Sequence, residues 1–511
     1  MTTATKKKKS FFDYFLNFLE KGGNALPHPA TLFAMFALGV LLLSVVGAWL
    51  GWQATHPATG EVITTVNLLS KEGLNRVLNE MVTNFTSFAP LGIVLVAMLG
   101  IGLAETSGLI GAFIRILVIK SPKRILTFVV VFAGILSNAA SDIGYVLLIP
   151  LAGIIFQAMG RHPFVGMAAA FAGVSGGFSA NLIIGTIDPL LAGLSEEAAH
   201  ILDPSYSVNP TANYYFMVVS TFLIALLGTW VTEKIIQPRF GKYEGEVQQE
   251  SIERLSKQEK KGVLWSLAVF AGWMILIFSG LFPSDGILRG ENGGLLSSPV
   301  IKGIITFLFL IAGSMGIVYG VINGKFKNDT DVANGMAQSL KTLSHYIVLV
   351  FFAAQFVAYF KWSNLGVILA ITGAEGLIQA NLGVIPLMLL FILLASTVNM
   401  LMGSASAKWA IMAPIFVPIF MLLGYSPELS QAVYRIGDSV TNVISPMMSF
   451  FALIIAYFQK YEKNAGLGTI IATMIPYSIA FFIGWSILLI GWIMLKAPLG
   501  PGAGLFYQLP G

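Results

Sequence analysis

The sequence contains no cysteine, only five histidines and few charged residues, and each shortage excludes a class of function. Without cysteine there is no disulfide, no thiolate nucleophile and no Cys-ligated metal. The histidines are scattered, with neither an HExxH motif nor an i, i+4 pair, so they indicate no zinc centre. The absence of a Walker A pattern argues against ATP as the energy source. Because no set of nucleophile and base is evident, we expect no enzymatic activity and no organic cofactor.

Hydrophobic residues, by contrast, make up 56% of the 511 residues, and charged residues only 11%. Soluble domains carry about 25% charged residues, so this chain is too apolar for a water-soluble globule. Many windows approach the roughly 20 apolar residues that span a bilayer as a helix. We therefore predict an all-α polytopic membrane protein in contact with lipid. Its net charge of +5 follows from basic cytoplasmic loops and indicates no nucleic-acid partner.

Lys and Arg residues in short loops predict the orientation, because such loops favour the cytoplasm. The Lys6–Lys9 cluster places the N-terminus inside, where residues 1–27 form either an amphipathic surface segment or a solvated tail. The same reasoning leaves the C-terminus outside. About nine full crossings are predicted, near residues 30–52, 85–119, 163–187, 211–236, 263–283, 301–323, 343–361, 429–458 and 466–495.

Two further apolar segments are interrupted in the middle by small and polar residues. Residues 125–160 are broken by "SNAASD" and have basic residues on both flanks, and residues 384–427 are broken by "NMLMGSASAKWA". We interpret both as re-entrant helical hairpins. Such bent backbone is tolerated at membrane depth only where protein or a water-filled cavity covers it.

An internal repeat relates the two hairpins. Shifting residues 141–175 by 264 onto 405–439 pairs Pro150 with Pro414, Gly160 with Gly424 and Pro163 with Pro427, with no gap. The predicted hairpins open to opposite faces, so the halves form an inverted-topology repeat, an arrangement common in secondary transporters. The chain then divides into a first half (28–236), a charged cytoplasmic loop (237–262) and a second half (263–511).

Polar residues near the two turns are candidates for binding substrate or a coupling ion. Asn138 and Asn399 stand near the turns, where each could bind a cation or cap a half-helix. Asp188 and Asp438 follow the hairpins inside apolar spans, where an ionisable group is costly and usually functional. Asp188 could instead cap the next helix. The glycines and prolines beside the two acids predict that both spans are discontinuous helices.

Three side chains of the second half have two possible roles each. Arg435 could clamp a substrate carboxylate or form an ion pair with Asp438 at i, i+3. Trp409 could stack on an aromatic substrate or anchor at an interface, and its repeat partner is Tyr145. Ser406 could bind a ligand or cap a helix.

Four stretches resemble the aminobenzoyl-glutamate transporter family: "SNAASDIGYVLLIPLAG", "GGFSANLIIGTIDPLLAG", "GSASAKWAIMAPIFVP" and "YRIGDSVTNVISPMM". The resemblance extends over essentially the whole chain. It implies a bowl-shaped homodimer in the bacterial inner membrane, with nine helices and two hairpins per protomer. In that membrane, the C-terminus that the basic residues place outside would be periplasmic. It also implies uptake of p-aminobenzoyl-glutamate or, as for some members, export of sulfonamide antimetabolites. By motif position the implied second-half site comprises Trp409, Pro427, Arg435, Asp438, Pro446, Ser406 and Asn399, and the implied first-half acid is Asp188.

The residues and the resemblance together predict an ion-coupled secondary transporter of aromatic carboxylates or sulfonamides, with Na⁺ or H⁺ as the coupling ion. Alternatives are a Na⁺-coupled dicarboxylate transporter, which two Asn-bearing hairpins also suit, and a passive channel, which an inverted repeat disfavours. Asn399 and Asp438 are the predicted ligands of a metal ion. The predicted substrate-binding residues are Trp409, Arg435, Ser406, Pro427, Pro446 and Asp188, and the predicted ion-coupling residues are Asp438, Asn399, Asn138 and Asn442.

Overall fold

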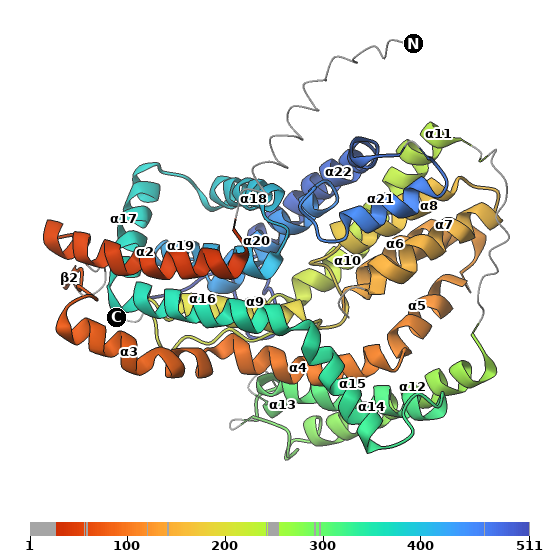
Figure 1. Ribbon diagram of the computed structural model, residues 1–511, viewed down its shortest axis with the longest axis horizontal. Helices are drawn as coiled ribbons and strands as arrows, with labels where there is room; N and C mark the ends of the chain where they lie inside the picture. The colour runs from red at the N-terminus through yellow and green to blue at the C-terminus, as the bar shows by residue number, and fades with distance from the viewer. Residues whose placement is uncertain are drawn as a thin grey trace, which may run out of the picture.

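The computed structural model describes residues 27–509, except 56, 58–59, 120, 140–142, 242, 244–254, 291–292, 296–297 and 464. The predicted N-terminal segment therefore lies almost wholly outside the described residues, as do Asp142 of the first turn and much of the charged loop. Within the described part, helices dominate, which confirms the all-α prediction (Figure 1). The exception is a short antiparallel pair, β1 (Gln53–Thr55) and β2 (Val62–Thr64).

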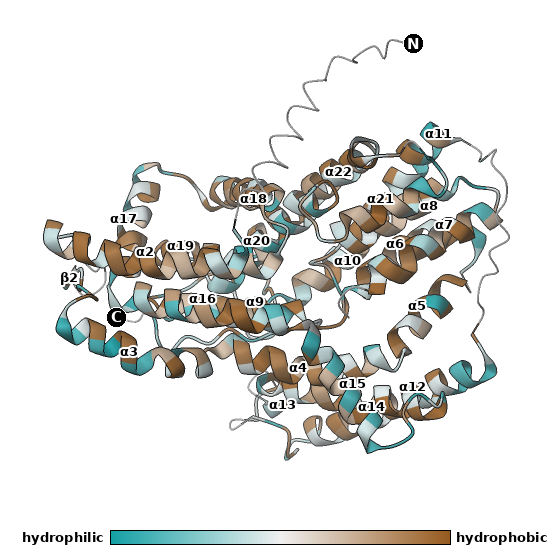
Figure 2. Ribbon diagram, viewed as in Figure 1, coloured by the Kyte–Doolittle hydropathy of each residue, from teal (hydrophilic) through white to brown (hydrophobic). Residues whose placement is uncertain are grey.

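Nine helical stretches of the described chain are long and apolar enough to cross a membrane. Much of their length is brown in Figure 2, as are several of the shorter helices. The count equals the predicted one, but the members differ, because two of the nine are the arms of the second hairpin. They are α2 (Pro29–Leu50), the stretch Lys71–Thr106, Tyr214–Phe240, α12 (Lys257–Leu281), α14 (Ile304–Ile322), α16 (Ser344–Trp362), α18 (Val384–Leu401), α19 (Ala405–Leu422) and α22 (Leu467–Met494).

The prediction of a single span over residues 85–119 was wrong. α4 (Ala89–Thr106) is followed by its C-cap residue, Ser107. The next residue, Gly108, has a φ of +91°, a left-handed conformation that a helix interior does not accommodate. A separate helix, α5 (Leu109–Ile119), follows. The sequence analysis also missed α17 (Leu365–Gln379), a short apolar helix before the second hairpin.

Both predicted hairpins are present. The first consists of α6 (Leu126–Ser137), a π-helical turn η2 (Gly144–Leu148) and α7 (Ile149–Ala158), and the second of α18 and α19. Each first arm packs on the helix that follows its hairpin. This partner is α8 (Pro163–Phe171) with its π-helical extension η3 (Ala172–Gly176) in the first half, and α20 (Pro427–Asn442) in the second.

Glycines at repeat-equivalent positions allow these close contacts. A Cβ on Gly173 would lie 2.2 Å from the carbonyl oxygen of Val131, and a Cβ on Gly437 would lie 2.6 Å from Cβ of Ala395. Gly173 and Gly437 are 264 positions apart, and so are Val131 and Ala395. The sequence offset of the repeat therefore also holds in the packing of the two halves.

The helices that follow the hairpins are interrupted, as predicted. The chain is non-helical between η3 and α9 (Ile187–Ala199), and again between α20 and α21 (Phe451–Gln459). The final long helices of the two halves, α10 (Tyr214–Val231) and α22, pack against each other. The interruptions bring polar backbone and side chains into an otherwise apolar interior.

The remaining helices surround this core. α2 packs along α16, and α4 packs along α14, which in turn contacts α12 (Figure 1). The other elements are η1 (Lys123–Ile125), α3 (Lys71–Thr86), α11 (Gln237–Phe240), η4 (Thr232–Ile236), α13 (Pro299–Lys302) and α15 (Asp329–Thr342).

Candidate functional site

A cavity of about 290 Å³ lies where the two hairpins turn. Asn138 and Tyr145 contribute to its wall from the first hairpin, and Gly403 and Ala405 contribute from the second. Segments far apart in the sequence thus line one half-open cavity. The described wall carries no charged side chain; its other members are Val94, Met98, Phe178, Thr186, Ile187, Leu190, Leu343, Asn442, Met448, Ser449 and Phe450.

An aromatic pair forms part of this wall. The rings of Tyr145 and Phe450 stack with centroids 4.6 Å apart and an interplanar angle of 9°. Tyr145 belongs to the first hairpin, and Phe450 ends the break between α20 and α21. A cavity of this size with mostly apolar walls and few polar groups suits a small organic ligand.

The turn of the second hairpin is held by a close backbone approach at Gly403. A Cβ at this position would lie 2.1 Å from the carbonyl oxygen of Met447. We expect Gly403→Ala to displace the turn, to lower stability by about 1–3 kcal/mol and to slow transport. Initial transport rates and thermal unfolding of the purified protein test this. The matched control is Gly39→Ala in α2, where a Cβ would meet nothing within 4 Å; equal transport rates for the two variants would contradict the expectation.

A buried lysine that the sequence patterns did not assign to the site lies beside the second turn. Lys408 is 0% exposed, and its Nζ lies 2.5 Å from Oδ1 of Asp438, which is 1% exposed. The same ammonium donates to Oδ1 of Asn399. Lys408 is the fourth residue of α19, near the positive end of the helix dipole, so burial there requires the partner carboxylate.

The amide of Asn399 connects this ion pair to the cavity. Its Nδ2 donates to the carbonyl oxygen of Asp438 at 2.7 Å and to Oδ1 of Asn442 at 2.9 Å. Asn442 forms part of the cavity wall. The structure thus brings three of the four predicted coupling residues together, and the fourth, Asn138, faces the same cavity from the other half.

The two predicted metal ligands already share a cation of the protein itself. Oδ1 of Asn399 and Oδ1 of Asp438 both contact the Lys408 ammonium. No group of three or more His, Cys, Asp or Glu side chains that could hold a metal occurs in the described part of the chain. The assignment of Asn399 and Asp438 as metal ligands stays a prediction.

Arg435 does not form the i, i+3 ion pair with Asp438 that was one of its two predicted roles, and its role as a clamp on a substrate carboxylate stays a prediction. Its Nη1 lies 2.6 Å from Oδ1 of Asp188, and both side chains are at least 96% buried. Asp188 is the second residue of α9, and its other oxygen accepts the backbone N–H of Gly185 at 2.7 Å, which fixes the loop that leads into this helix. The i, i+3 pair of Arg435 with Asp438 is not formed, because each residue has a different buried partner. The Arg435–Asp188 pair instead links α20 to α9 across the two halves.

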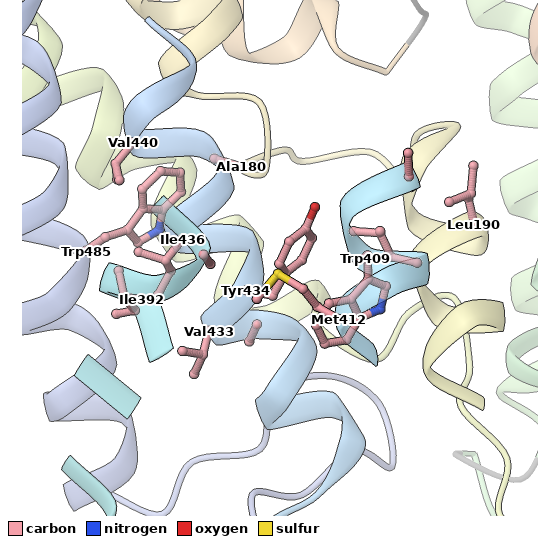
Figure 3. Close-up of a cluster of buried hydrophobic side chains, with 14 of the residues drawn as sticks. Ala180, Leu190, Ile392, Trp409, Met412, Val433, Tyr434, Ile436, Val440 and Trp485 are labelled. Atoms are coloured by element: carbon pink, nitrogen blue, oxygen red, sulfur yellow. The ribbon is translucent and has the colours of Figure 1, made fainter. Parts of the chain in front are cut away.

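Trp409 is packed inside the protein rather than on the cavity wall. Its ring stacks on Tyr434 with centroids 4.5 Å apart, and Figure 3 shows Met412 beside the pair. The indole is 0% exposed, and its Nε1 donates to Oγ of Ser195 at 3.0 Å. This geometry favours a packing role for Trp409, whereas Tyr145 and Phe450 present the aromatic surface to the cavity.

We therefore expect Trp409→Ala to impair transport of all substrates alike and to lower stability by about 3–5 kcal/mol. Trp409→Phe keeps a ring against Tyr434 and should be much milder. Transport kinetics with an aromatic and an aliphatic substrate, beside thermal unfolding, measure both effects. A rise in KM for the aromatic substrate alone would instead show that Trp409 stacks on the substrate.

The remaining predicted residues lie on the elements that carry the site. Ser406, in the first turn of α19, has its hydroxyl 3.3 Å from that of Ser404. Pro427 is the first residue of α20, where a missing N–H is harmless. Pro446 lies in the break that leads to the cavity residues Met448 and Phe450.

A chain of buried polar side chains beyond Trp409 was missed by the sequence analysis. Ser195 donates to Gln431 at 2.7 Å, and Gln431 donates to Asn213 at 2.8 Å. Asn213 in turn donates to the carbonyl oxygen of Glu428, whose carboxylate accepts the hydroxyl of Tyr206 at 2.8 Å. The sequence shows each of these polar residues inside an apolar segment. It does not show which of them pair across more than 200 positions.

Two repeats whose hairpins end on one buried cavity, beside two buried ion pairs, define a transmembrane transporter. The chain belongs to the AbgT transporter family, since the model of the "AbgT putative transporter family" matches residues 14–507.

Similar proteins agree with this assignment. The chain is 36% identical over 485 residues, 95% of each chain, to the p-aminobenzoyl-glutamate transport protein of Escherichia coli K12. Its structure matches the YdaH transporter of Alcanivorax borkumensis with a TM-score of 0.89 at 46% identity, covering 93% of this chain and 100% of that one. It matches MtrF of Neisseria gonorrhoeae, described as one of a class of antimetabolite efflux pumps, with a TM-score of 0.91 at 50% identity, covering 96% and 100%.

Proposed function

We propose that the protein transports p-aminobenzoyl-glutamate and related p-aminobenzoate-like anions, including sulfonamide antimetabolites, by ion-coupled alternating access. The observation that carries this proposal is the half-open cavity that both hairpins line, with Tyr145 and Phe450 as an aromatic surface for the substrate ring. The p-aminobenzoyl-glutamate transport protein and the efflux pump MtrF, to which the chain is similar, support this substrate class.

Coupling is proposed to act through the buried ion pair of the second half. Substrate in the cavity meets Asn442, which is bonded to Asn399, and Asn399 contacts both Asp438 and Lys408. Occupancy of the cavity and the charge state of the pair are therefore linked through two amides. Whether Na⁺ or H⁺ carries the coupling is decided by the transport measurement below.

The test uses the purified protein in sealed proteoliposomes with labelled p-aminobenzoyl-glutamate. The Na⁺ gradient and the pH gradient are imposed one at a time, and we expect the labelled substrate to accumulate with the gradient of the coupling ion. We also expect counterflow when unlabelled substrate is placed on the opposite side. A passive channel gives no counterflow. Competition by succinate as strong as that by p-aminobenzoate would instead favour the dicarboxylate alternative.

We further propose a homodimer in the bacterial inner membrane, with a cytoplasmic N-terminus and a periplasmic C-terminus. The resemblance to the family supports the dimer, and the distribution of Lys and Arg supports the orientation. Light scattering of the detergent-solubilised protein measures the oligomeric state. Reactivity of single cysteines near each end toward an impermeant reagent in intact cells measures the orientation.

A further inference from the structure

The first turn of α9 faces the cavity. Thr186, which precedes this helix, lines the cavity together with Ile187 and Leu190. A threonine at this position usually caps the helix by accepting a backbone N–H of the first turn, but the side chain of Thr186 makes no such bond. Its hydroxyl has no hydrogen-bond partner in the part of the chain that the structure describes. Because Arg435 balances the charge of Asp188 in the same turn, the positive end of the helix dipole and a free hydroxyl meet at the cavity wall.

A second donor reaches the cavity from the other half, and Lys408 sets its direction. An ammonium can only donate, so Asn399 turns its Oδ1 toward Lys408 and its NH₂ group toward Asn442. That NH₂ group donates to Oδ1 of Asn442 at 2.9 Å. The NH₂ group of Asn442 itself is left without a partner in the described structure, although the residue is only 8% exposed. It is therefore the last donor of a chain of hydrogen bonds that starts at the ammonium.

Both of these groups are accessible. Four side-chain atoms of the described structure are unpaired and shielded from solvent, and neither Nδ2 of Asn442 nor Oγ1 of Thr186 is one of them. Because each of the two atoms lacks a partner, each must retain accessible surface, and both residues line the same cavity. The stacked rings of Tyr145 and Phe450 belong to the same wall. A ligand that combines an aromatic ring with an acceptor oxygen matches these features.

We propose that Oγ1 of Thr186 and Nδ2 of Asn442 donate hydrogen bonds to an acceptor oxygen of the substrate, while Tyr145 and Phe450 contact its ring. The oxygen belongs to the carboxylate of a p-aminobenzoate-like substrate or to the sulfonyl group of a sulfonamide. The proposal rests on the proposed function and assigns the oxygen-bearing end of the substrate to the start of α9. Thr186 is then a residue that determines specificity, although no sequence motif indicated it.

Two substitutions of Thr186 distinguish substrate binding from packing, because valine keeps the shape without the hydroxyl and serine keeps the hydroxyl without the methyl group. In proteoliposomes with labelled p-aminobenzoate, we expect Thr186→Val to raise KM by about 10-fold or more with little change in kcat, and Thr186→Ser to stay within about threefold of the wild type. Thr372→Val removes a hydroxyl that donates only to Ile368 within α17, and this control should leave KM unchanged. An unchanged KM in Thr186→Val, or a larger rise in Thr186→Ser, would overturn the proposal.

The variant Asn442→Asp tests the second donor. It keeps an oxygen toward Asn399 and replaces the NH₂ group with a second oxygen, which repels an anion. We expect kcat/KM to fall by about 100-fold or more for p-aminobenzoate, and to fall less for labelled sulfanilamide, which is neutral. Asn79→Asp, at an exposed position of α3, adds the same charge away from the cavity and should change neither value. Thermal unfolding shows that each variant is folded.

The remaining outcomes separate this site from the other assignments. Equal losses for both compounds in Asn442→Asp, with an altered dependence on Na⁺ or pH, would overturn its contact with substrate and assign Asn442 to ion coupling, as predicted from the sequence. No uptake of either compound by the folded wild type would refute the proposed function itself. Normal uptake by the wild type and by Thr186→Val alike would refute only the site proposed at α9.

Discussion

Replacing Asp438 with alanine is expected to abolish transport and to lower the free energy of unfolding by about 3–5 kcal/mol. The substitution leaves the Lys408 ammonium fully buried without its carboxylate, and it removes the ion pair through which coupling is proposed to act. Initial transport rates in proteoliposomes and unfolding in denaturant measure the two effects. From the sequence alone we would expect the same loss of transport in a protein that stays fully stable, because the partner of Asp438 is not evident there.

A double variant separates the two effects. Replacing a buried ion pair by neutral residues of similar size is often neutral for stability, so Lys408→Met with Asp438→Asn should recover most of the lost stability. Transport should remain absent. The exposed Asp285, replaced by alanine, is the matched control and should change neither quantity. Normal transport by Asp438→Ala would remove this residue from the coupling mechanism.

Replacing Arg435 with alanine should be nearly as severe. It leaves the carboxylate of Asp188 buried at the start of α9 without its counter-charge, and it breaks the ion pair that links α9 to α20. We expect a loss of about 3–5 kcal/mol and little transport. A double-mutant cycle with Asp188→Asn should show strong coupling between the two positions, because each single variant already breaks the pair.

The cycle also distinguishes this role from a clamp on the substrate carboxylate. If Arg435 binds substrate directly, Arg435→Ala keeps its stability and raises KM only for substrates that carry a carboxylate. In that event, the Arg435–Asp188 contact would have to open during transport. An unchanged free energy of unfolding in Asp188→Asn would likewise favour the substrate clamp.

Local sequence patterns predicted the elements of the fold, because the elements depend on the residues within each segment. The interruptions at "SNAASD" and "NMLMGSASAKWA" predicted both hairpins, and the glycines and prolines beside Asp188 and Asp438 predicted both broken helices. The 264-residue repeat paired Gly173 with Gly437 in the sequence, and the structure shows that both glycines contact equivalent positions of the hairpin arms. A left-handed Gly108 was not predicted, since nothing in its neighbours distinguishes it from a glycine inside a helix.

Partners across the core were not predictable in the same way. Trp409 bonds to Ser195, 214 positions away, and Arg435 pairs with Asp188 rather than with its helix neighbour Asp438. Such pairings depend on how the two halves pack against each other, which no local pattern encodes. Lys408 could have indicated one such pairing, because a lysine inside an apolar run requires a buried acid as its partner.

The two hairpins line one cavity, and a cross-link between them tests this arrangement most directly. Because the chain has no cysteine, Asn138→Cys with Ala405→Cys introduces the only two thiols. A short bifunctional maleimide should join the two arms within one chain, block transport, and react more slowly when substrate fills the cavity. Two independently labelled thiols, with no cross-link in actively transporting protein, would show that the hairpins do not share a site.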